Sequence, residues 1–95
     1  MGRAKKPKPK RLAEKLLRIR EALRLSQNEL IELFDVEERL TQDYISYYER
    51  GIREPSLTVL LRYARVVGVC LEILIDDSLD LPVRLPQSPK HHYKA

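Results

Sequence analysis

The chain contains one cysteine, no tryptophan and one phenylalanine, and its three glycines stand far apart. A single cysteine, Cys70, excludes an internal disulfide and a cysteine metal cluster, and its place at the start of an apolar segment favours a core position. There is no glycine-rich phosphate loop. No apolar run approaches the roughly 18 residues of a membrane span, and the N-terminus lacks the apolar core of a signal peptide. We therefore expect a cytoplasmic protein and no membrane association.

Groups for catalysis or metal binding are also scarce. The two histidines, His91 and His92, adjoin each other in a tail and make a poor base or metal pair. The acids Asp76, Asp77 and Asp80 could attract a divalent ion, but their spacing matches no recognised loop, and a solvated helix end accounts for them. We expect no enzyme, no cofactor and no metal site.

The positive charge is concentrated at the two ends of the chain. The 95 residues, 43% of them hydrophobic, suffice for one small domain with a formal net charge of +4. Residues 1–11 carry six basic and no acidic side chains, residues 82–95 carry three basic ones, and residues 12–81 carry nine basic against fourteen acidic ones. An anionic partner would therefore be met by the basic ends and by individual arginines of an acidic body.

Apolar spacing and capping residues predict an all-α fold of five helices. Apolar residues at 12, 16, 19 and 23 form one stripe of a first helix that starts near residue 10 or 11. Ser26 and Glu29 form a capping box that opens a second helix, which runs to Phe34.

Three further helices follow the same kind of signal. Thr41 caps a helix over 42–50 that buries Ile45 and Tyr48 and stops at Gly51. Ser56 caps a fourth helix, which ends at Gly68, and a short fifth helix spans about 70–75. The inner face expected for the fourth helix comprises Leu57, Leu60, Leu61, Ala64 and Val67.

The chain divides into a disordered basic arm over 1–10, a helical domain over 11–77 and an extended tail over 78–95. In the tail, Leu79, Leu81, Val83 and Leu85 alternate with polar residues, and Pro82 restricts the segment to a sheet edge or to no sheet. This segment either packs on its own domain or joins two chains in a dimer.

Several short motifs occur together in one order: 25–30 (LSQNEL), 45–51 (ISYYERG), 54–57 (EPSL) and 64–69 (ARVVGV). As a set they resemble the Cro/phage-repressor-like (Xre) helix-turn-helix family of prokaryotic transcriptional regulators, over roughly residues 12–76. The resemblance implies a compact five-helix, lambda-repressor-like domain that binds double-stranded DNA, usually as a homodimer.

The chain departs from the family pattern between its second and third helices. The connection from Val36 to Ile45 is several residues longer than is typical, and Asp35 stands where the usual turn has glycine. The additional residues, around 37–40, either lengthen the second helix by a turn or form a loop.

The third helix presents four polar side chains away from Ile45 and Tyr48: Gln42, Asp43, Ser46 and Tyr47. A helix fits the major groove of B-DNA, where Gln pairs with adenine, Asp accepts from cytosine N4, and an aromatic ring touches a thymine methyl. We expect base contacts from these four residues. The alternative is that they are solvated residues of an exposed helix.

Other positions suit the DNA backbone. We expect phosphate contacts from Gln27 at a helix N-terminus and from Thr41, Arg50 and Arg53, the alternatives being cap continuation for Gln27 and carbonyl capping for the arginines. The arm lysines, Lys5, Lys6, Lys8 and Lys10, either follow the phosphates or serve only as a solubilising tail. The family resemblance pairs Arg20 with Glu49 as a structural bridge that orients the third helix.

We therefore expect a sequence-specific regulator that represses by promoter occlusion. The alternative is a protein-interaction module, such as an antitoxin, that meets a protein partner through the acidic loop 35–38 and the segment 79–85.

Overall fold

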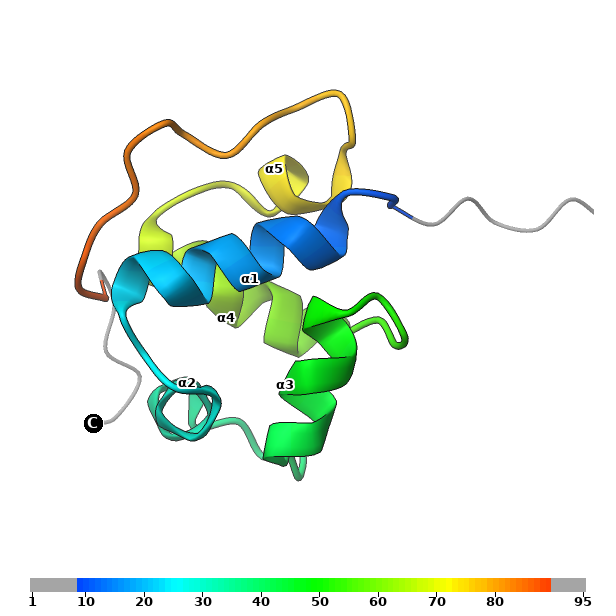
Figure 1. Ribbon diagram of the computed structural model, residues 1–95, viewed down its shortest axis with the longest axis vertical. Coiled ribbons are helices and arrows are strands. Elements are labelled where there is room, and N and C mark those ends of the chain that lie inside the picture. The colour runs from blue at the N-terminus through cyan, green and yellow to red at the C-terminus, as the bar shows by residue number, and fades with distance from the viewer. Residues whose placement is uncertain (1–8, 90–95) are drawn as a thin grey trace, which may run out of the picture.

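The computed structural model describes residues 9–89, which fold into five α-helices without a strand in that range. The helices are α1 (Leu12–Leu23), α2 (Gln27–Phe34), α3 (Gln42–Glu49), α4 (Leu57–Val67) and α5 (Leu71–Ile75). Helices α2 and α3 lie side by side below α1, and α4 passes behind α1 (Figure 1). The predicted all-α fold of five helices is confirmed.

The core is built from the predicted stripe of α1 and one face of each other helix. Leu16 and Ile19 of α1 are completely buried, as are Leu30 and Phe34 of α2 and Ile45 of α3. The ring of Phe34 meets that of Tyr63, from α4, edge to face at 4.8 Å between centroids. Helix α4 contributes most to the core because apolar residues recur along its inner face.

Two of the three expected N-caps carry the predicted hydrogen bonds. Ser26 Oγ accepts from the Glu29 amide at 3.0 Å, and the Ser26 amide donates to Glu29 Oε1 at 2.8 Å, which completes the capping box. Ser56 Oγ accepts from the Val59 amide at 3.2 Å. Thr41 occupies the N-cap position of α3, but its side chain makes no capping bond.

The long connection between α2 and α3 is a loop, not an added helical turn. Asp35 ends α2 in the left-handed region, with φ of 48°, a conformation that Asp adopts more readily than most non-glycine residues. Glu38 Oε1 then accepts a 2.7 Å hydrogen bond from Ser56 Oγ, at the N-cap of α4. Val36 and Leu40 are partly buried against the core. These contacts attach the loop to the domain without continuing α2.

The segment 76–89 packs along α1 of its own domain, from the N-terminal end of that helix to its C-terminal end (Figure 1). Leu81 is buried, and Arg18 of α1 donates to the carbonyls of Pro82 and Val83 at 3.1 and 3.2 Å. Val83 is 91% exposed because the chain bends at 83–84. The expected alternation of apolar residues therefore fails at that position.

Lys15 is buried in the same contact, with only 2% of its surface exposed. Its ammonium donates to the carbonyls of Ile73, Asp76 and Leu79 at 2.7, 3.1 and 2.8 Å. The lysine thus joins α1 to the end of α5 and to the segment that follows.

Two sequence-based assignments to the core are wrong. Cys70, expected in the core, is exposed at the N-cap of α5. Leu57, expected on the inner face of α4, is 74% exposed. The buried positions of α4 start only at Val59, and Leu57 lies in the first turn of the helix.

Asp77, which is remote in sequence but adjacent in space, supplies the N-terminal cap of α1. Its two carboxylate oxygens accept from the backbone amides of Lys10 and Arg11 at 2.8 and 3.0 Å, whereas the N-cap residue Arg11 makes no side-chain cap bond. These hydrogen bonds, from Lys10 first and then Arg11, hold the pKa of Asp77 below its ordinary value.

We expect this cap to make stability depend on acid pH. The folded state binds the Asp77 proton more weakly than the unfolded chain. The stabilising contribution is therefore complete above the ordinary Asp pKa of about 3.9 and is lost as the pH falls through the folded-state value. Thermal unfolding of wild type and Asp77→Asn from neutral pH into acid should show a shallower acid decline for the variant. Parallel acid declines would contradict the role of the cap.

Candidate nucleic-acid interface

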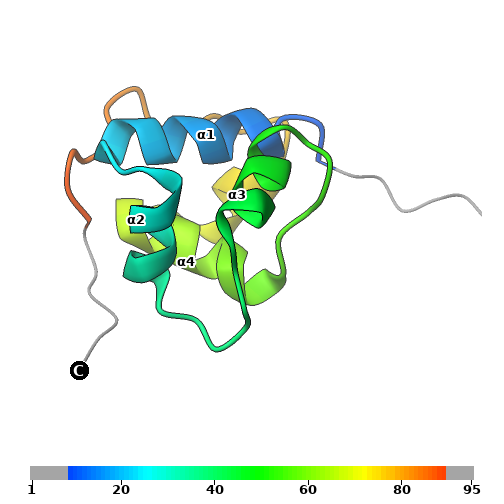
Figure 2. The same cartoon turned by 60° about the horizontal axis from the view of Figure 1, so that its bottom comes forward.

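Helices α2 and α3 form a helix-turn-helix-like pair on one side of the molecule (Figure 2). They pack against each other, and the loop 35–41 runs between them along the edge of the domain. Residues of α3 follow each other by about 100° around the helix axis. Ile45 and Tyr48 point into the core, so the opposite face of α3 is turned outward.

The outward face of α3 is formed by Asp43, Ser46, Tyr47 and Arg50, which we call the α3 face. Asp43 and Arg50 are exposed, and Ser46 and Tyr47 are partly exposed. Gln42 is exposed beside this face, at the first turn of the helix. All four residues expected to read bases are thus accessible along one side of α3.

Arg50 lies folded back over the α3 face. Its Nε donates to Ser46 Oγ at 3.1 Å, and its guanidinium carbon lies 5.6 Å from the centre of the Tyr47 ring. Arg50 also forms the C-terminal cap position of α3, followed by Gly51 in the left-handed region with φ of 75°.

Arg53 lies in the loop after α3, outside the helix itself. Its guanidinium carbon is 5.1 Å from the centre of the Tyr44 ring. Tyr44 also contacts the rings of Tyr47 and Tyr48, each at 6.4 Å between centroids. The sequence pattern did not mark Tyr44 as a site residue. Its contact with Arg53 is visible only in the tertiary structure.

Glu49, at the end of α3, is joined to both α1 and α2. Arg20 Nε and Nη2 donate to the two Glu49 carboxylate oxygens at 2.6 and 3.0 Å, and the hydrogen bonds to Glu49 raise the pKa of Arg20. Arg20 Nη1 also donates to the Leu25 carbonyl at 2.9 Å. The Glu49 side chain is 5% exposed and that of Arg20 is 18% exposed.

Gln27 belongs to this same network. Its Nε2 donates to Glu49 Oε1 at 3.0 Å, so the side chain expected to meet a phosphate is engaged inside the protein. Arg20, Gln27 and Glu49 together connect α1, α2 and α3, and thereby set the angle at which the α3 face is presented.

Tyr63 of α4 lies in the core close to this network. Its hydroxyl is buried and has no hydrogen-bond partner within residues 9–89. Burial, with a smaller effect of the Glu49 charge, raises the pKa of the Tyr63 phenol, which therefore stays neutral.

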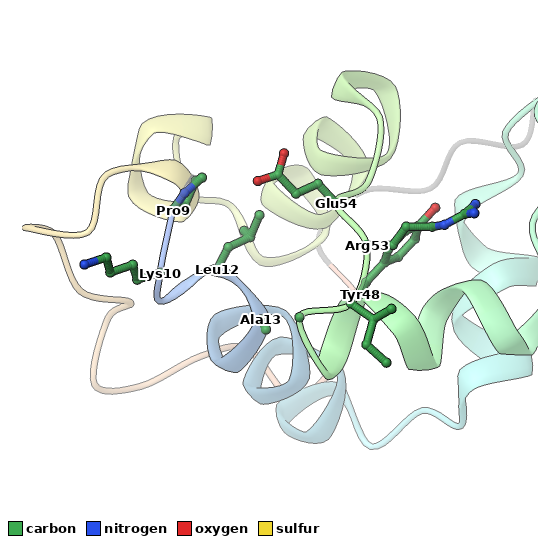
Figure 3. A pocket seen from close by; sticks show the side chains of 9 residues that line it. Pro9, Lys10, Leu12, Ala13, Tyr48, Arg53 and Glu54 are labelled. Atoms are coloured by element: carbon green, nitrogen blue, oxygen red, sulfur yellow. The ribbon is translucent and has the colours of Figure 1, made fainter. Parts of the chain in front are cut away.

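Pro9 and Lys10, which directly precede α1, lie at the same end of the molecule as Arg53. A hollow of about 280 Å³ separates Pro9 and Lys10 from the loop after α3, with Lys10 and Arg53 at its opposite ends (Figure 3). Lys10 is exposed. Lys5, Lys6 and Lys8, expected to contact DNA, lie outside the described residues.

The acidic residues that follow α5 form hydrogen bonds or ion pairs within the protein. Asp76 accepts from the amide and hydroxyl of Ser78, Asp77 caps α1, and Asp80 forms an ion pair with Arg11. Within residues 9–89 no group of three or more acidic, His or Cys side chains is arranged to hold a metal ion. None of the helices in that range has the length and apolarity needed to span a bilayer.

Comparison with protein families matches residues 16–74, more than half of the chain, to the family described as helix-turn-helix. No curated protein and no solved structure matches the chain. The matched residues extend from the middle of α1 to α5 and include α2, the loop and α3. The chain therefore belongs to the helix-turn-helix family of the Cro and phage-repressor (Xre) type, whose activity is that of a DNA-binding transcription regulator.

Proposed function

We propose that the protein is a sequence-specific regulator of prokaryotic type that places α3 in the major groove and represses by covering a promoter. The observation that carries this proposal is the α3 face, exposed and polar, on a helix held by the Arg20–Glu49 bridge. A helix held in this way can present its side chains to base edges in one orientation.

The contacts divide by chemistry. Gln42, Asp43, Ser46 and Tyr47 are assigned to base edges. Thr41 and Arg53 are assigned to phosphates, because Thr41 is exposed without a capping bond and Arg53 is exposed beyond the helix end. At the start of α2 the backbone amides of Gln27 and Asn28, which the capping box does not use, are assigned to a phosphate in place of the engaged Gln27 side chain.

The arm lysines and a second copy of the chain complete the proposal. Lys5, Lys6, Lys8 and Lys10 supply phosphate contacts beside α3. A symmetric homodimer would place two α3 helices about 34 Å apart and would select a near-palindromic site in cytoplasmic DNA.

Selection of binding sites from random duplex DNA, at two salt concentrations, tests the proposal. An enriched inverted repeat is the expected result. Binding that shows no enriched motif and falls steeply with salt would mean that only phosphates are contacted.

The absence of DNA binding would favour the alternative of a protein-interaction module. Its contact surface would be the acidic loop 35–38, where Asp35, Glu37 and Glu38 are exposed. The segment 79–85 is less suited to this role, since Leu81 is buried against α1 and its surroundings.

Substitutions on and beside the α3 face should relax sequence preference. Gln42→Ala and Tyr47→Ala should each cost roughly 1–3 kcal/mol of binding free energy at the selected site, with little change on unrelated duplexes. Competition binding with the selected site and scrambled DNA measures the difference. A uniform loss on every duplex would contradict base contact by these residues. Glu32→Ala, an exposed change on α2, is the matched control.

A further inference from the structure

We propose that Arg50 reads a guanine in the major groove, and is not the phosphate contact that its place at the end of α3 suggests. The inference rests on the proposed function, which it deepens by naming one base of the site. It follows from where the Arg50 side chain lies and from which of its donors remain available.

Arg50 lies at the C-terminal end of the α3 face, on the line that runs along the middle of that face. It follows Ser46 by four residues and Tyr47 by three, so that all three lie on one side of the helix. This side is opposite Ile45, which is completely buried. A long side chain on this side of the helix, folded back toward Ser46 and Tyr47, can reach the base edges in the groove, whereas phosphates line its walls.

Contacts within the protein hold the Arg50 guanidinium over that face. The 3.1 Å hydrogen bond to Ser46 Oγ uses Nε, and the Tyr47 ring lies 5.6 Å from the guanidinium carbon. Within residues 9–89 no acidic side chain forms an ion pair with Arg50. The two terminal amino groups, Nη1 and Nη2, are therefore left to donate to a ligand.

Guanine offers the acceptor pair that this donor pair fits. Its O6 and N7 atoms lie side by side on the major-groove edge, and a planar arginine binds both. The orientation imposed by Ser46 and Tyr47 reduces the conformational entropy lost on binding.

Asp43, at the N-terminal end of the α3 face, supports the assignment of Arg50 to a guanine. A carboxylate is repelled by phosphates, but it accepts from cytosine N4. The seven residues that separate it from Arg50 span about 10 Å along the helix, which corresponds to about three base-pair steps. We expect the guanine within about three base pairs of a cytosine read by Asp43.

Arg53 provides a matched control. It also lies against a tyrosine ring, that of Tyr44, and it is exposed. It stands in the loop beyond α3, and no side-chain hydrogen bond within residues 9–89 directs it onto the α3 face. Arg50 and Arg53 thus both lie against a tyrosine ring, but only Arg50 lies on the helix face that is proposed to enter the major groove.

The test compares wild type, Arg50→Lys, Arg50→Ala and Arg53→Ala on the duplex selected by wild type. Each guanine of the half-site is replaced in turn by 7-deazaguanine, which lacks the N7 acceptor, and by adenine. For wild type, one replacement should weaken binding by about tenfold or more. Arg50→Ala should bind the original and replaced duplexes with nearly equal affinity, and Arg50→Lys, whose ammonium can still donate to guanine, should show a reduced guanine preference. Arg50→Lys keeps the charge, so its affinity for unrelated DNA should stay close to that of wild type.

Arg53→Ala should weaken binding to all duplexes alike and lower the salt slope by about one, while the guanine preference persists. The proposal is overturned if Arg50→Ala behaves in that way, or if the selected half-site contains no guanine; neither result affects the wider function. Failure of wild type to select any motif would overturn the proposed function as well. Unchanged thermal unfolding of the exposed Arg50 variants excludes a folding effect.

Discussion

Replacement of Glu49 by alanine should lower the free energy of unfolding by about 3–5 kcal/mol. The change leaves the Arg20 guanidinium, which is only 18% exposed, without the carboxylate that accepts two of its hydrogen bonds. It also removes the acceptor of the hydrogen bond that the Gln27 side-chain amide donates. Because a buried charge without its partner keeps the desolvation cost and loses the attraction, the loss exceeds that of a surface pair.

Urea unfolding followed by circular dichroism measures this difference. Glu32→Ala, the same change at an exposed position of α2, should remain within about 0.5 kcal/mol of wild type. Arg20→Ala and the double variant complete a thermodynamic cycle, in which the two losses should be strongly non-additive. Additive losses would show that the bridge does not couple α1 to α3.

Replacement of Lys15 by methionine should cost about 3 kcal/mol or more, since three carbonyl groups lose a charged donor in a buried place. Methionine fills a similar volume but donates nothing to Ile73, Asp76 and Leu79. The segment after α5 should then detach from α1 before the domain unfolds as a whole.

Hydrogen exchange and limited proteolysis over 76–89 detect that detachment. Arg18→Ala is the matched control, because Arg18 donates to two carbonyls of the same segment from an exposed position. It should cost less than about 1 kcal/mol. Equal losses of stability for Lys15→Met and Arg18→Ala would mean that burial of the Lys15 ammonium does not strengthen its hydrogen bonds.

Much of the fold could be read from local patterns. The Ser26 capping box and the Ser56 cap predicted two helices at their observed starts, and the stripe of α1 predicted its start within one or two residues, because helix periodicity and capping depend on neighbours in the chain. The same rules misassigned Leu57, since periodicity along α4 does not say how far its neighbours extend.

The candidate site was predicted less completely. The four polar residues of α3 follow from helix geometry, and the structure brings Arg20 to Glu49 as the family resemblance implied. The engagement of Gln27 with Glu49, and the contact of Tyr44 with Arg53, depend on how separate elements meet. No local pattern carries that information.

The sequence by itself determined the helical class, the approximate helix starts and the outward face of α3, because these depend on spacing within single helices. Tertiary structure alone decided that the residues after Asp35 form a loop attached through Glu38 to Ser56. It also decided that Lys15 is buried and that Asp77 caps α1. Each of these depends on contact between segments remote in the chain, where packing determines which polar groups find partners.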